Sequence, residues 1–83
     1  MAAKKRFKIG ESAMGGIIDV EIYGKLISVK ALDWTTKKVV SSGSAMVDDN
    51  NCSEKIENYL LDLTTCYYAS KMMEWIKSKR NIS

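Results

Sequence analysis

Residues 17–34 read IIDVEIYGKLISVKALDW and contain the clearest local pattern in the chain. Two runs rich in β-branched residues flank Gly24-Lys25, and glycine at the first central position of a two-residue loop suits a type II′ hairpin turn. With these residues at the turn, the isoleucines and valines of both runs face one another on one side. The other side is mixed and holds the opposite-charge pair Asp19 and Lys30. The stretch therefore predicts an antiparallel hairpin with one apolar and one mixed face.

Further strands are expected on both sides of this hairpin. Alternation near the N-terminus predicts a short strand, and glycines mark a loop from Gly10 to Gly16. A turn within residues 33–38 leads to a last strand with a centre rich in serine and other small residues, and either of its faces could pack inward. The expected strands are about 5–9, 17–23, 26–34 and 39–47.

A single long helix is predicted for the C-terminal part of the chain. Asn51 and Glu54 have the spacing of a capping box, and no proline or glycine interrupts residues 53–80. We therefore expect a helix of about 53–80. The predicted fold is one α+β domain over residues 1–83, in which an antiparallel three- to four-stranded β-meander packs against this helix.

The apolar stripe of the predicted helix changes sides about halfway along. At about 100° per residue, Ile56, Leu60 and Leu63 share one face, and the apolar residues after Tyr67 lie on the opposite face. An unbroken helix of this length spans about 42 Å, whereas eight-residue strands span about 27 Å. One end of the helix should then extend beyond the sheet and expose its second stripe.

An exposed stripe of aromatic residues and methionine is typical of a protein-binding surface. We therefore expect a non-catalytic protein-binding module whose contact residues are Leu61, Tyr68, Met72, Trp75 and Ile76. The partner is either a target protein or a second copy of the chain, in a homodimer with antiparallel helices. The alternative is a break near residues 62–66, where Thr64 and Thr65 are weak helix formers. A second helix would then fold back and bury the stripe within the chain.

Nucleic-acid binding is the second functional interpretation. The 13 Lys and Arg residues exceed the 10 Asp and Glu residues, for a net charge of +3, and basic residues concentrate at both ends of the chain. The candidate contacts are an N-terminal arm and residues near the second turn, namely Lys4, Lys5, Arg6, Lys8, Trp34, Lys37 and Lys38. Asp19, Glu21 and Asp33 are expected on the same open face, where they would repel phosphate.

The sequence offers little catalytic chemistry. It has no histidine, and it lacks a phosphate-binding glycine loop. On one helix, Cys52 and Cys66 would lie about 21 Å apart, too far for a disulfide, and two cysteines alone cannot complete a zinc site. No apolar run is long enough to span a membrane, and no signal peptide opens the chain. We therefore expect a cytoplasmic protein that is not an enzyme and needs no cofactor or metal.

The resemblance of this chain to known proteins is carried by Lys8-Ile9-Gly10 through Gly15-Gly16, the hairpin around Gly24, and Thr64-Thr65-Cys66-Tyr67-Tyr68 before Trp75. In the layout of these features, the chain resembles small accessory proteins of phages and mobile elements, among them anti-CRISPR and related anti-defence inhibitors. The likeness is one of architecture and covers the whole chain. It implies a stoichiometric inhibitor that acts without catalysis in the host cytoplasm, and it assigns no functional residue.

Overall fold

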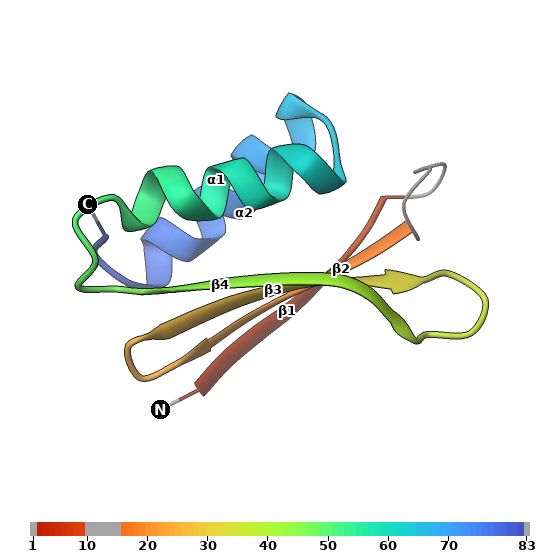
Figure 1. Ribbon diagram of the computed structural model, residues 1–83, viewed down its shortest axis with the longest axis horizontal. Coiled ribbons are helices and arrows are strands. Elements are labelled where there is room, and N and C mark those ends of the chain that lie inside the picture. The colour runs from red at the N-terminus through yellow and green to blue at the C-terminus, as the bar shows by residue number, and fades with distance from the viewer. Residues whose placement is uncertain (1, 10–15, 83) are drawn as a thin grey trace.

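Four antiparallel strands form one sheet in chain order, and two helices cover one face of it (Figure 1). The computed structural model describes residues 2–9 and 16–82. The expected α+β meander is confirmed, and the loop predicted from Gly10 to Gly16 lies outside the described residues except for Gly16. The elements are β1 (Ala2–Lys8), β2 (Gly16–Tyr23), β3 (Leu26–Asp33), β4 (Val39–Met46), α1 (Cys52–Leu63) and α2 (Cys66–Lys79).

The β2–β3 hairpin has the register that the sequence predicts. Ile22 pairs with Ile27 and Asp19 pairs with Lys30 across a turn in which Gly24 has a φ of 59°. The apolar face of the hairpin forms the middle of the core, since its isoleucines and valines are almost fully buried. Strand β1 pairs with β2 and begins at Ala2, three residues before the predicted start.

Strand β4 turns its smallest residues toward the helices. A Cβ atom placed on Gly43 would lie 2.7 Å from Cγ of Tyr59 in α1, and Ala45 is buried in the core. The lack of bulk at these positions lets α1 approach the sheet closely. A register irregularity between Ala31 and Leu32 lies near the start of β4.

The prediction of one long helix was wrong. The chain leaves the helix at Thr64 and Thr65, both of which have extended backbone angles, and α2 then runs back across the sheet. The break falls within the alternative window of residues 62–66. Asn51 occupies the N-cap position of α1, but its side chain makes no capping hydrogen bond, so the expected capping box does not form.

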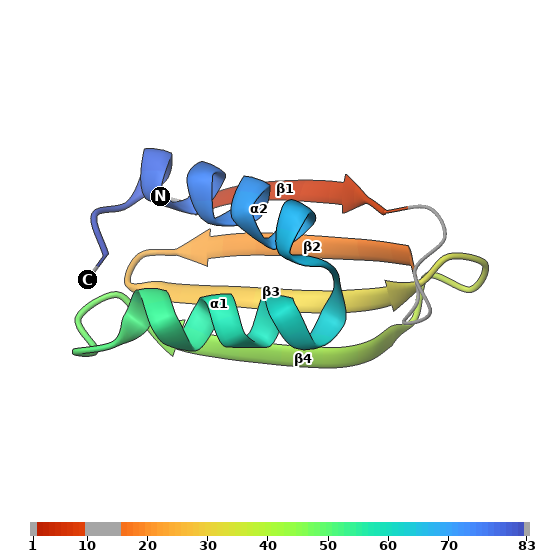
Figure 2. The same ribbon diagram turned by 90° about the horizontal axis from the view of Figure 1, so that it is seen from above.

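Both apolar stripes reach the same sheet because the chain reverses direction between the helices. Figure 2 shows α1 above β3 and β4, and α2 above β1 and β2. On a straight helix the two apolar stripes would lie on opposite sides. Because the second half folds back, both stripes face the sheet. The buried helical residues are Cys52, Ile56, Leu60 and Leu63 in α1, and Ala69, Met72, Met73 and Ile76 in α2. Neither of the described helices is long and apolar enough to cross a membrane.

Candidate binding surface on the open face of the sheet

The helical surface that the sequence predicts for partner binding lies largely inside the protein. Met72 and Ile76 are fully buried, so they are not available to a partner. Tyr68 and Trp75 pack against the core, and the Trp75 ring meets Phe7 of β1 edge to face, with the centroids 6.5 Å apart. Leu61 is exposed, but it belongs to α1. The expectation of an exposed C-terminal stripe was therefore wrong, because α2 folds back onto the sheet.

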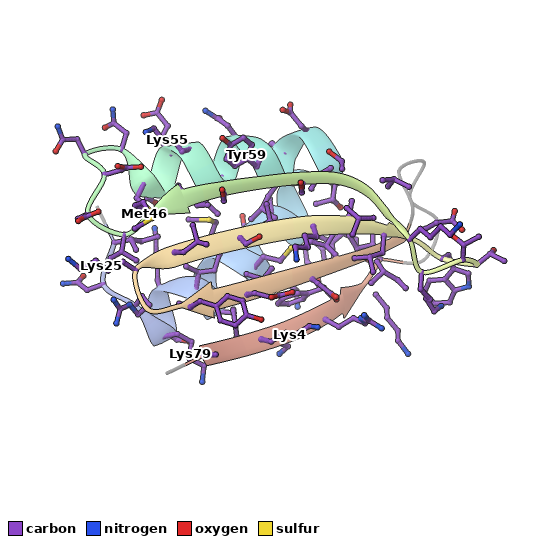
Figure 3. All side chains as sticks on the ribbon, turned by 60° about the horizontal axis from the view of Figure 1, so that its bottom comes forward. Lys4, Lys25, Met46, Lys55, Tyr59 and Lys79 are labelled. Carbon is purple, nitrogen blue, oxygen red and sulfur yellow. The ribbon has the colours of Figure 1, made fainter. Side chains whose placement is uncertain are left out.

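The opposite face of the sheet is not covered by either helix (Figures 1 and 3). At one end of this open face, Tyr23 pairs with Leu26, and Leu26 pairs with Met46, so the three side chains form a row across β2, β3 and β4. Their exposed fractions are 50%, 37% and 40%. We call these three residues the apolar row.

Two carboxylates lie beside the apolar row in the middle of the open face. Asp19 and Glu21 of β2 are only 3% and 7% exposed. Arg6 of β1 donates from Nε and Nη2 to the two carboxylate oxygens of Asp19, at 2.7 and 3.0 Å. Lys4 Nζ lies 3.8 Å from an oxygen of each carboxylate, and Lys30 Nζ lies 3.8 Å from Oε1 of Glu21. Side chains from the strands on both sides therefore cover the two negative charges.

The pKa values of these groups reflect the same contacts. The hydrogen bonds from Arg6 hold the pKa of the Asp19 carboxyl below its usual value, with support from the charges of Lys4 and Lys30, although burial opposes the shift. A hydrogen bond with Glu21 raises the pKa of the Tyr23 hydroxyl. Asp19 is therefore ionised at neutral pH and the Tyr23 hydroxyl keeps its proton.

The residues proposed for nucleic-acid binding do not form one surface. Lys4, Arg6 and Lys8 alternate along β1 on the open face, and this segment is a paired strand of the sheet. Lys5 points the other way, with Nζ 5.2 Å from the ring centroid of the core-packed Phe7. The loop between β3 and β4 carries the remaining candidates, Trp34, Lys37 and Lys38.

The loop residues interact mainly with one another. Lys37 Nζ lies 5.1 Å from the ring centroid of Trp34 and also donates to its carbonyl oxygen. Asp33 accepts hydrogen bonds from the backbone N–H groups of Thr35 and Thr36, which lower the pKa of its carboxyl. Asp33 thus stabilises this loop, whereas the sequence interpretation placed it with Asp19 and Glu21.

Sequence reasoning missed the apolar row as a candidate site. The hairpin register already places Tyr23 opposite Leu26 on the mixed face, which is a usable signal. Met46 could not be added to the pair, because the sequence did not decide which face of the last strand packs against the core.

The remaining candidate groups are metal ligands and the two cysteines. Within residues 2–9 and 16–82, no group of three His, Cys, Asp or Glu side chains is placed to hold a metal ion. Both cysteines are free, and burial raises the pKa of the Cys52 thiol, whereas Cys66 is exposed.

The chain matches no protein-family model, no curated protein sequence and no solved structure.

Proposed function

We propose that this chain is a small, non-catalytic protein-binding module that binds its partner with the open face of the sheet. The observation that carries the proposal is the apolar row of Tyr23, Leu26 and Met46, exposed beside a cluster of paired charges. Tyrosine, methionine and arginine are enriched in protein interfaces, and large anchor side chains account for most of the binding energy there.

The charges on this face favour a partner with an acidic surface. The open face carries Lys4, Arg6, Lys8 and Lys30 against Asp19 and Glu21, which is four positive and two negative charges, or a net +2. A partner would meet the cations first, because the two carboxylates are almost covered. The complementary surface is therefore an apolar depression for the row with carboxylates next to it.

An inhibitory role is part of this proposal. A stoichiometric inhibitor needs affinity for its target and no chemistry of its own, and the architectural likeness to anti-CRISPR and other phage-encoded inhibitors is consistent with that mode of action. The open face would then act by occupying a surface that the target needs.

Nucleic-acid binding is the second candidate function, on the same face. The observation in its favour is the covering of Asp19 and Glu21, since it weakens the repulsion of phosphate expected from the sequence. Tyr23 could stack on an unpaired base. The protein partner is favoured because Arg6 already uses two of its donors on Asp19, and because exposed Leu26 and Met46 offer nothing to phosphate.

Affinity capture with matched surface variants tests the proposal. The tagged chain is used as bait in extracts of the cells in which it is naturally produced, beside the double variant Tyr23→Ser with Leu26→Ser. The control is Tyr67→Ser with Leu61→Ser, which removes the same residue types from the helical layer, where they are 63% and 42% exposed. We expect the wild type and the control to retain one partner protein in a stoichiometric ratio, and the open-face variant to lose it by at least about tenfold.

Nuclease treatment and rising salt separate the two candidates. Recovery of nucleic acid that disappears with nuclease, and that falls by orders of magnitude between about 50 and 200 mM salt, would favour the second function. A partner that stays with the open-face variant and is lost from the helical-layer control would contradict both.

A further inference from the structure

The two edges of the sheet differ sharply in charge. Strand β1, at one edge, carries four cations within seven residues, and basic side chains on an edge strand oppose pairing with another strand. Strand β4, at the other edge, reads VVSSGSAM and carries no charge over eight residues. No strand among the described residues pairs with the outer side of β4. At Met46 the outward N–H and C=O groups already bond Asp49. The outward N–H and C=O groups of Ser42 and Ser44, in the middle of β4, can accept a further strand.

One flank of α1, beside β4, has a charge pattern that is complementary to the same flank of a second copy placed antiparallel to it. Tyr59 of α1 lies over Gly43, near the middle of β4, and is partly exposed. Lys55 lies about one turn before Tyr59 and Asp62 about one turn after it, on the same flank of the helix. Figure 3 shows Lys55 and Tyr59 on α1 beside β4. Along the helix axis, the flank thus carries first a positive charge, then an aromatic ring and then a negative charge.

We propose that β4 pairs antiparallel with β4 of a second copy of this chain, so that the two sheets join into one. A two-fold axis near Gly43 brings Tyr59 of both copies together and sets Lys55 of each copy against Asp62 of the other. The same axis sets Ser42 opposite Ser44 of the second copy, so that each can donate its backbone N–H to the C=O of the other.

A second copy fits this edge better than an unrelated strand would. Its edge is equally uncharged, and its helix flank supplies the opposite charge at each end of the contact. The ion pair that Lys55 makes with Asp49, at 3.4 Å between half-exposed groups, is compatible with a second carboxylate nearby. The dimer would place two open faces side by side, which extends the surface proposed for partner binding without depending on it.

Solution mass by light scattering on the purified chain tests the dimer, with no partner present. Measured from about 1 µM to about 1 mM, the wild type should pass from monomer to dimer. Lys55→Glu and Asp62→Lys should each raise the dissociation constant by about tenfold, because the two-fold axis repeats each like-charge contact. The combined variant, Lys55→Glu with Asp62→Lys, should restore it to within about threefold of the wild type, since the swap recreates both pairs.

Two further variants complete the design. Ser44→Lys should abolish the dimer, because it places a charge in the strand pairing. Glu57→Lys changes a charge on the opposite flank of α1 and should leave the dimer unchanged. A wild type that stays monomeric throughout, or a charge swap that fails to restore association, overturns the proposal. Neither result bears on the open-face partner, which the capture experiment tests separately.

Discussion

Asp19 shows how a carboxylate can be kept nearly out of water on a face that no helix covers. Two side chains of β1 supply the cover, with Arg6 in two hydrogen bonds and Lys4 at 3.8 Å. The sequence predicts the pairing of Asp19 with Lys30 across the hairpin, and the register confirms it. The contact with Arg6 could not be predicted, because it depends on how β1 aligns with β2 over a separation of 13 residues.

Replacing the Asp19 carboxylate should measurably destabilise the fold. Asp19→Asn leaves Arg6 with a weaker acceptor, and we expect a loss of about 1–3 kcal/mol in the free energy of unfolding at pH 7. Urea unfolding at several pH values measures the loss. Asp48→Asn is the control, since Asp48 and its partner Lys25 are both well exposed and such pairs contribute little.

The pH dependence of this loss follows from the lowered pKa of Asp19 in the folded state. A lowered folded pKa gives stability that is fully present above the unfolded value of about 3.9 and is lost as the pH falls through the folded value. The difference between wild type and Asp19→Asn should thus hold from pH 7 to about pH 5 and shrink below about pH 4. An undiminished difference in strong acid, or an equal loss from Asp48→Asn, would contradict this role.

At the scale of elements, the hairpin was predictable, whereas the sequence offered the helix break only as an alternative to an unbroken helix. The hairpin follows from alternation and one turn, which are local properties of residues 17–34. The break depends on whether burial of the second helix against the distant sheet outweighs the free energy lost by interrupting the helix. Weak helix propensity at Thr64 and Thr65 costs an unbroken helix only tenths of a kcal/mol per residue. Burying Met72 and Ile76 against the sheet contributes about 1.5–3 kcal/mol each, which outweighs the few hydrogen bonds lost at the break.

The packing of α1 on β4 depends on the missing side chain at Gly43. An added Cβ would lie 2.7–2.8 Å from three atoms of the Tyr59 ring, near its attachment to the backbone, so the helix itself has to move. We expect Gly43→Ala to destabilise the fold by about 1–3 kcal/mol. Ser44→Ala, at an exposed neighbour in the same strand, should change the stability by less than about 0.5 kcal/mol.

A double-mutant cycle shows whether the Tyr59 ring is the cause. In a Tyr59→Ala background the cost of Gly43→Ala should fall, because the atoms that clash are gone. Thermal or urea unfolding of the four chains gives the coupling. If the two costs simply add, the close approach of α1 to Gly43 does not limit the packing.

At the scale of the whole molecule, the direction of α2 decides which surface is left for binding. Periodicity identified Met72 and Ile76 as apolar positions on one face, and this is confirmed. Which surface covers that face depends on tertiary structure. The sequence analysis expected a partner protein to cover it, whereas the protein's own sheet does so. The same reversal leaves the other side of the sheet free for the apolar row.

The free energy of unfolding of Met72→Ala tests most directly whether the second stripe is core. Met72 is fully buried in α2, and we expect the variant to lose about 2–5 kcal/mol in urea denaturation. Leu61→Ala, at an exposed position of α1, should lose less than about 0.5 kcal/mol. If Met72→Ala unfolds at the urea concentration of the wild type, the stripe faces solvent or a partner and α2 does not lie on the sheet.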